Sequence, residues 1–115
     1  MCIRDRSEAA TSSTSTQGKR VYLDPALVAR VRGKRVVLVD DVINTGVSAL
    51  SAVRLLERAG AEVVGLTVLL SEGHAWRAVV RELGTGWDQR VRAVGHIPMF
   101  EAAGDGRWQP MAGTL

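Results

Sequence analysis

Residues 36–48 decide the fold, and they read Val36-Val37-Leu38-Val39-Asp40-Asp41-Val42-Ile43-Asn44-Thr45-Gly46-Val47-Ser48. The first four are apolar and mostly β-branched, which predicts a strand buried on both faces of a parallel sheet. Two carboxylates follow, and then a short loop of small and hydroxyl residues leads into a helix. Ligands of open α/β sheets bind at the carboxyl ends of the strands. The stretch therefore predicts a fold class and, at its acidic end, the position of a site.

The sequence on both sides of this stretch alternates between strand and helix patterns. Asp24 is a helix N-cap with Pro25 at the first helical position, and Gly33 ends that short helix. Apolar residues recur at helical spacing further along, with glycines as stops. The remaining predicted elements are strands over 20–23, 36–39, 63–70 and 91–97 and helices over 48–59 and 74–83, followed by an irregular segment over 104–115.

This alternation with short connections predicts βαβ units. We expect the α/β class: an open, Rossmann-like parallel sheet flanked by helices on both faces. Such a sheet normally has five or six strands, and only three good ones are present. The chain is therefore expected to be incomplete at the N-terminus. Residues 1–18 are expected to be a disordered leader or mobile loop. The first part, Met1 to Arg6, fits none of the patterns that follow and is expected to lie outside the fold.

Composition limits the function classes. The chain has 115 residues and 46% hydrophobic residues, which suits one domain with a packed core. One cysteine excludes an internal disulfide framework, and the longest apolar run is far short of a membrane helix. No secretory signal is visible, so we expect a cytoplasmic protein without a membrane partner. The formal charge is +3 and concentrates in residues 1–35, yet the few aromatic residues do not interleave with the basic ones. Nucleic acid is therefore an unfavoured partner.

The loop after the acidic pair has the chemistry of a phosphate site. A helix N-terminus offers free N–H groups and a positive dipole end, and Thr45 and Ser48 add hydroxyl donors. Gly46 allows close backbone approach. Asp40 and Asp41 cannot bind phosphate, but they can accept hydrogen bonds from vicinal hydroxyls or organise Mg²⁺ through water. A diol and a phosphate at this separation indicate a ribose 5-phosphate.

Residues 40–48 resemble the phosphoribosyl-pyrophosphate (PRPP) motif of type I phosphoribosyltransferases, and a looser resemblance runs from about residue 11 to residue 100. The resemblance implies that residues 19–115 are the C-terminal part of a phosphoribosyltransferase domain. It implies that Asp40 and Asp41 hold the ribose hydroxyls and stabilise an oxocarbenium-like transition state, with residues 44–48 around the 5-phosphate. It also implies Mg²⁺ on the pyrophosphate of PRPP, no direct protein ligand to the metal, and a homodimer.

The departures from the motif bear on the acceptor base. Val47 replaces the usual second glycine, so its side chain must point away from the phosphate. Asn44 stands where 6-oxopurine enzymes of the family carry an aspartate, and Ser71-Glu72-Gly73 lacks the lysine that those enzymes use. Both argue against hypoxanthine or guanine and permit adenine. Phe100, just after the third strand, is a candidate to stack on the base.

The predicted function is transfer of ribose 5-phosphate from PRPP to a base, most simply a purine, with release of pyrophosphate. The pyrophosphate-binding part of the family's site is not found here, so this chain alone is expected to hold an incomplete active site. The alternative is a regulator with the same fold that binds PRPP or a nucleotide and controls nucleic acid. Response-regulator receivers and ATPases also place carboxylates after a strand. A receiver needs a phosphorylatable aspartate at the end of a later strand, but the next strand here ends Leu69-Leu70-Ser71-Glu72, and the G-x-x-x-x-G-K-[ST] loop of an ATPase is missing from the sequence.

Overall fold

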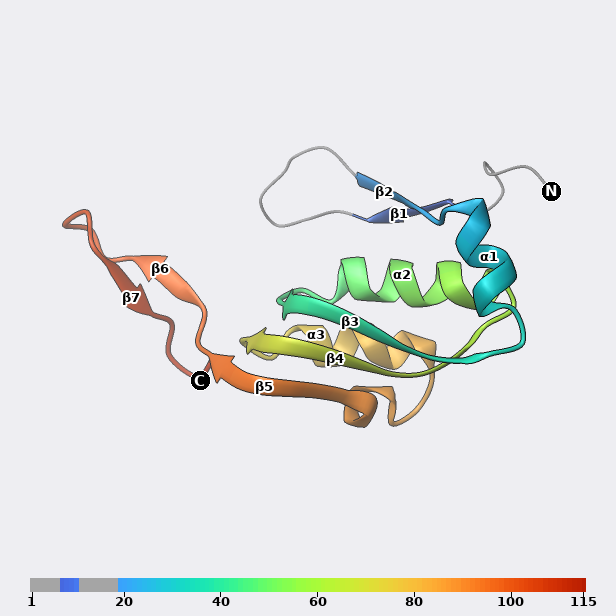
Figure 1. Ribbon diagram of the computed structural model, residues 1–115. Coiled ribbons are helices and arrows are strands. Elements are labelled where there is room, and N and C mark those ends of the chain that lie inside the picture. Colours follow the sequence, from blue (N-terminus) through green and yellow to red (C-terminus); the bar gives the residue numbers. More distant parts are fainter. Residues whose placement is uncertain (1–6, 11–18) are drawn as a thin grey trace.

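The structure, a computed structural model, describes residues 7–10 and 19–115. Its centre is a three-stranded parallel sheet in the order β3-β4-β5, and two antiparallel hairpins lie outside it (Figure 1). The strands are β1 (Ser7–Ala10), β2 (Lys19–Tyr22), β3 (Arg35–Ile43), β4 (Glu62–Glu72), β5 (Val91–Ile97), β6 (Phe100–Ala102) and β7 (Trp108–Pro110). The α-helices are α1 (Pro25–Val31), α2 (Val47–Arg58) and α3 (Trp76–Val80), and two 3-10 helices cover Arg81–Leu83 and Trp87–Arg90.

The predicted parallel sheet with flanking helices is confirmed. Val36 of β3 pairs with Val63 of β4, and Leu66 of β4 pairs with Val91 of β5, both in parallel. Helix α2 connects β3 to β4 and begins one residue before the expected position. Helix α1 starts as expected, with the Asp24 carboxylate accepting a hydrogen bond from the N–H of Ala26 at 2.9 Å. Local signals were therefore sufficient for these elements.

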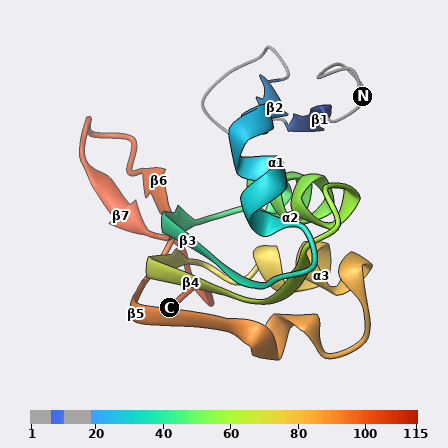
Figure 2. The same cartoon turned by 45° about the vertical axis from the view of Figure 1, so that its right-hand side comes forward.

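Helices α2 and α3 pack on the same face of the sheet (Figure 2). Val53 and Leu56 of α2 and Trp76 and Val80 of α3 are buried against strand residues such as Leu66. Trp76 is 4% exposed, and its indole N–H donates to the carbonyl of Gly73 at 3.2 Å. The core of the described chain is the layer between this face and the two helices.

The other face of the sheet is open in the described residues, so the expectation of a first strand buried on both faces was wrong. Val39 of β3 is 74% exposed and Val94 of β5 is 79% exposed, and Val37 and Leu69 are also exposed. These side chains alternate with the buried ones because successive residues of a strand point to opposite faces. Helices on both faces were expected as well, and within the described residues none covers this side.

Two further expectations were corrected by the structure. The helix expected over 74–83 is shorter: it spans 76–80 and tightens into a 3-10 turn at Arg81–Leu83. Residues 104–115, expected to be irregular, contribute β7, which pairs with β6 in an antiparallel hairpin. Glycines at the tip of this hairpin hid a strand of only three residues from pattern analysis.

The N-terminal segment contributes a hairpin, because β1 pairs antiparallel with β2. Residues 7–10 thus form a strand inside the segment 1–18 for which no fold was expected. The rest of that expectation, for 1–6 and 11–18, falls outside the described residues. Among the described helices, none combines the length and the apolar character needed to cross a membrane.

Candidate functional site

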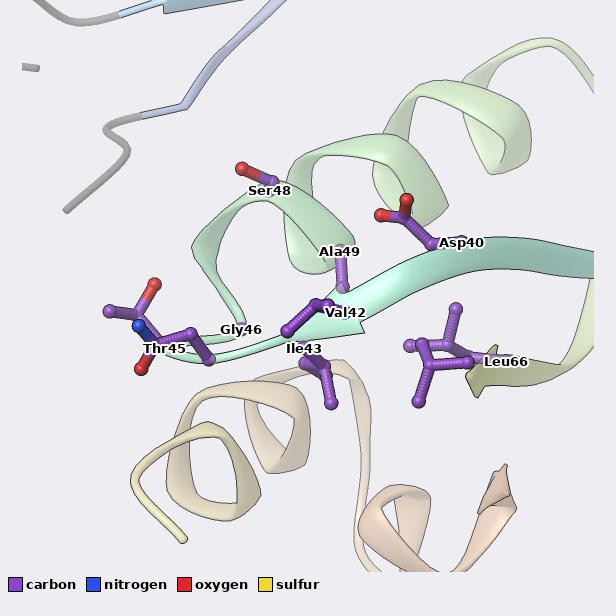
Figure 3. Close-up of a pocket in the computed structure, with 10 residues that line it drawn as sticks. Asp40, Val42, Ile43, Thr45, Gly46, Ser48, Ala49 and Leu66 are labelled. Carbon is purple, nitrogen blue, oxygen red and sulfur yellow. The ribbon is translucent and has the colours of Figure 1, made fainter. Parts of the chain in front are cut away.

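A small cavity opens where β3 ends and α2 begins (Figure 3). Its volume is ≈ 120 Å³, well below the roughly 300–1,000 Å³ of a typical small-molecule pocket. It therefore has room for only part of a nucleotide-sized ligand. Its lining residues are Asp40, Val42, Ile43, Asn44, Thr45, Gly46, Ser48, Ala49, Leu66 and Val68.

The two carboxylates occupy different positions. Asp40 pairs across the sheet with the buried Val68, so it lies on the face that α2 covers, and Figure 3 shows it beside that helix. Asp41 points to the opposite face by strand alternation and is not among the lining residues. Each bonds to a main-chain amide of β3: Asp40 accepts from the N–H of Asp41 at 2.8 Å and Asp41 from the N–H of Val42 at 2.7 Å.

The electrostatics of the pair are asymmetric. Desolvation raises the pKa of Asp40 above its usual value of 3.8, and the neighbouring carboxylate of Asp41 adds to this rise, while the Asp41 N–H acts against it. The pKa of Asp41 is lowered, chiefly because the N–H of Val42 donates to its carboxylate. On acidification the first proton therefore enters at Asp40, the carboxylate that lines the cavity.

The turn into α2 leaves donors free for an anion. Gly46 is the N-cap, at φ 86° and ψ −4°, and no side chain caps the helix there. Among the described residues, the one side-chain acceptor for an N–H of this turn is the Thr45 hydroxyl, which accepts from Val47 at 3.3 Å. A Cβ at Gly46 would lie 3.1 Å from the Cα of Trp76. Glycine is thus required here both for its positive φ and for space.

One polar atom in the loop lacks a partner. The Oδ1 atom of Asn44 is buried, and no hydrogen-bond donor is found for it among the described residues. Buried carbonyl oxygens of this kind are normally satisfied, so a water or a ligand donor is expected at this position. Asn44 therefore belongs to the binding surface of the cavity.

The structure brings together seven of the predicted site residues and leaves three apart. Asp41 and Val47 do not line the cavity, and Phe100 lies at the start of β6, 47% exposed and paired with Pro110. Three lining residues were not predicted: Ala49, Leu66 and Val68, which form the apolar wall. In the sequence these three look like ordinary core residues. Their place in the cavity wall becomes visible only when α2 is packed on the sheet. The binding roles of all these residues remain predictions.

The residues also suit an indirectly held Mg²⁺. No cluster of three or more metal-ligating side chains occurs in the part of the chain that the structure describes. Asp40 and Asp41 nevertheless offer hard carboxylate oxygens, which bind Mg²⁺ readily through water. A cation carried by a phosphorylated ligand fits this arrangement.

Parts of this chain are similar in sequence to known proteins. Orotate phosphoribosyltransferase from Pyrobaculum aerophilum is 47% identical over 57 residues, covering 49% of this chain and 30% of that protein. Orotate phosphoribosyltransferase from Listeria monocytogenes is 46% identical over 55 residues, covering 47% and 26%. Adenine phosphoribosyltransferase from Streptomyces galbus is 56% identical over 41 residues, covering 36% and 22%. The chain thus spans less than a third of the length of these relatives.

A solved structure, adenine phosphoribosyltransferase from Rhodothermus marinus, superposes with a TM-score of 0.58 at 27% identity, covering 79% of this chain and 48% of that one. Residues 3–92 match the family described as the phosphoribosyl transferase domain. This range contains every residue that lines the cavity. With three quarters of its length in that match, the chain belongs to the phosphoribosyl transferase domain family.

Proposed function

We propose that this chain carries the ribose 5-phosphate half of the site of a phosphoribosyltransferase, an enzyme that transfers the 5-phosphoribosyl group of PRPP to a purine base. The observation that carries the proposal is the cavity itself. It joins a carboxylate at a strand end, Asp40, to the uncapped N-terminus of α2 at Gly46. Family membership and relatives named orotate and adenine phosphoribosyltransferase support the reaction class.

The phosphate end of the ligand matches the start of α2. Free N–H groups of the first turn, the positive end of the helix dipole and the hydroxyls of Thr45 and Ser48 suit a dianionic 5-phosphate. The side chain of Val47 does not line the cavity, so it does not compete with a phosphate for this space.

The sugar end of the ligand matches the acidic pair. A carboxylate accepts hydrogen bonds from the two ribose hydroxyls, and such bonds to a charged acceptor are the stronger kind. Asp40 lines the cavity, whereas the side chain of Asp41 points to the opposite face of β3, so Asp40 is the carboxylate placed to accept a ribose hydroxyl. Their negative charges also stabilise positive charge that develops on the ribose ring as the bond to pyrophosphate breaks.

The reaction needs no covalent intermediate with the protein. A ring nitrogen of the base attacks the anomeric carbon, pyrophosphate leaves with the bonding electron pair, and the nitrogen releases its proton. Mg²⁺, when bound, neutralises charge on the pyrophosphate. The residues of this chain hold the ribose and the 5-phosphate in place while the base displaces pyrophosphate from the anomeric carbon. Their contribution is positioning and electrostatic stabilisation.

The acceptor base is proposed to be an uncharged purine. The carboxylate of orotate would need a cationic partner, whereas adenine would not. At the carboxyl edge of the sheet, β4 ends with Ser71 and Glu72, and Gly73 follows, so this segment adds an acidic rather than a basic residue. Phe100 is proposed as a stacking partner of the base in the whole protein.

The test is calorimetric titration of the 115-residue chain with PRPP and Mg²⁺, with AMP, orotidine 5′-phosphate and ATP as comparison ligands. The expected result is binding of PRPP and AMP in preference to ATP. The Asp40→Asn/Asp41→Asn variant should weaken PRPP binding at least tenfold, since hydrogen bonds to a charged group contribute about 1.5–3 kcal/mol each.

The matched control is Glu101→Gln/Asp105→Asn, which also removes two carboxylates, both from the distant hairpin. It should bind PRPP like the parent chain. Equal affinities in all three proteins would overturn the site assignment. Preferential binding of orotidine 5′-phosphate over AMP would retain the site and reject the purine.

A further inference from the structure

A second groove, larger than the candidate site, opens beside β5, an edge strand of the described sheet. Its volume is ≈ 450 Å³, within the roughly 300–1,000 Å³ of a typical small-molecule pocket. Residues of α3, of the 3-10 helix Trp87–Arg90 and of β5 line it, and none of them lines the cavity at Gly46. We call it the arginine groove, and its lining includes Arg77, Asp88, Gln89, Val91, Arg92 and Ala93.

A buried carboxylate holds the wall of the groove together. The chain between α3 and β5, gold to orange in Figure 2, turns back on itself before β5 begins. This turn brings Asp88 to α3 and the 3-10 turn that follows it. There its carboxylate accepts from Nη2 of Arg81 at 2.9 Å and lies 3.8 Å from Nη1 of Arg77. The bond from Arg81 lowers the pKa of Asp88, so the carboxylate stays ionised near neutral pH.

Positive charge exceeds negative charge around the groove. Asp88 contacts the guanidinium groups of Arg77 and Arg81, and Arg92 adds a third cation. In the part of the chain that the structure describes, no ion pair is found for Arg92. Glu82, on the neighbouring 3-10 turn, pairs with an arginine of α2 instead. One carboxylate thus stands against three arginines, which leaves an excess of two positive charges.

Arg77 is fixed in position without using its N–H donors. Its guanidinium carbon lies 4.6 Å from the centroid of the Trp76 ring, a cation–π contact. Its distance of 3.8 Å from Asp88 is too long for a hydrogen bond. Among the described residues no hydrogen bond from its guanidinium is found, and its side chain is 46% exposed. The ring and the carboxylate therefore orient a guanidinium that can still bind an anion.

We propose that the arginine groove binds the phosphate group of a small phosphorylated molecule, at a site separate from the cavity at Gly46. A guanidinium offers paired N–H donors that match two oxygens of a phosphate. Arg77 and Arg92 line the groove from α3 and from β5, so an anion between them would be held by two elements. A phosphate dianion also matches the excess of two positive charges. The proposal does not depend on the function proposed above.

The test is NMR titration of the 115-residue chain with inorganic phosphate at constant ionic strength, with chloride as the control and succinate as a second dianion. The Nε–H signals of Arg77 and Arg92 and the indole N–H of Trp76 should shift along one saturable curve. A shift that chloride reproduces, or that does not saturate, would overturn the proposal. Shifts confined to the amides of residues 44–48 would also overturn it, while they would leave the proposed function intact. Binding of succinate as tight as that of phosphate would overturn the assignment to phosphate.

The matched variants separate the groove from general charge attraction. Arg77→Gln/Arg92→Gln should weaken phosphate binding about tenfold or more, because hydrogen bonds from charged donors are the stronger kind. Arg30→Gln/Arg35→Gln removes the same charge from α1 and from the start of β3, and it should bind phosphate like the parent chain. Equal affinities in these proteins would overturn the proposal.

A single variant keeps the test decisive if the double variant fails to fold. Arg92→Gln breaks no ion pair found within the described residues, so its effect reports on binding rather than on stability. It should weaken phosphate binding about fivefold. A parent-like affinity of a folded Arg92→Gln would overturn the proposal.

Discussion

The sheet β3-β4-β5 has one face under helices and one face that the described residues leave bare. On the covered face Leu66 and Val68 are each 1% exposed, whereas Val39 and Val94 on the open face are 74% and 79% exposed. All four are aliphatic, and they come from the same three strands. Apolar composition therefore places a residue in a sheet, but the neighbouring layer decides whether it contributes to stability.

The comparison extends to the candidate site. Asp40 belongs to the covered face and lines the cavity, and Asp41 belongs to the open face and does not. An acidic pair that is contiguous in sequence is thus divided by strand alternation. Substitutions at matched positions on the two faces test this difference.

Leu66→Ala and Leu69→Ala remove the same side chain from opposite faces of β4. Leu66→Ala should lower the free energy of unfolding by about 2–5 kcal/mol, because it leaves a cavity in the core. Leu69→Ala should lower the free energy of unfolding by less than about 1 kcal/mol, because Leu69 is 57% exposed. Urea denaturation followed by circular dichroism measures both. Equal losses would show that the open face is packed in solution.

Gly46→Ala tests the turn that joins the covered face to α2. The positive φ of 86° and the approach of Trp76 should together cost about 1–3 kcal/mol and weaken phosphate binding. Gly33→Ala is the matched control: its φ is 70°, but nothing lies within 4 Å of the added Cβ. The melting temperature of Gly46→Ala should fall further than that of Gly33→Ala, because only the Cβ at position 46 meets Trp76. Identical melting temperatures would contradict that contact.

Asp40→Asn and Asp41→Asn should differ in how ligand binding depends on pH. Ribose hydroxyls donate to the ionised carboxylate, so affinity is lost as pH falls through the pKa of Asp40, which desolvation raises above 3.8. Asp40→Asn should lose this pH dependence along with about tenfold affinity at neutral pH. Asp41→Asn should retain it, since the pKa of Asp41 is lowered.

Calorimetry of the two variants between pH 4 and 7 provides the readout for this prediction. The same raised pKa means that ionised Asp40 opposes folding at neutral pH. Asp40→Asn should then be slightly more stable than the parent chain at pH 7, and this gain should vanish below the pKa. Matching pH profiles for the two variants would argue against their division between faces.

Val39→Thr/Val94→Thr should have the smallest effect on stability, within about 0.5 kcal/mol, because both side chains already contact water. It should reduce self-association, since exposed apolar patches promote it. Light scattering at rising concentration measures this effect. Val68→Thr on the covered face is the control, and there a buried hydroxyl without a partner should cost more than about 1 kcal/mol.

Much of the fold was predictable because its signals are local. Asp24-Pro25 fixes the start of α1, and the run Val36–Val39 with its acidic end identifies a strand and the edge where a ligand would bind. The hairpin β6–β7 was missed because three-residue strands carry too little pattern. The 3-10 turn after α3 was missed because Arg81–Leu83 continues the apolar spacing of a helix.

By itself the sequence determined which residues form the strand, the loop and the helix of the candidate site, because capping, β-branching and glycine placement act over a few residues. Tertiary structure alone decided the rest. It placed Asp40 in a cavity and Asp41 outside it, supplied the wall of Leu66 and Val68, and stacked His74 on His96. The residues involved lie far apart in the sequence: Asp40 and Val68, which pair across the sheet, are 28 positions apart. Only the packing of separate elements can bring such residues together.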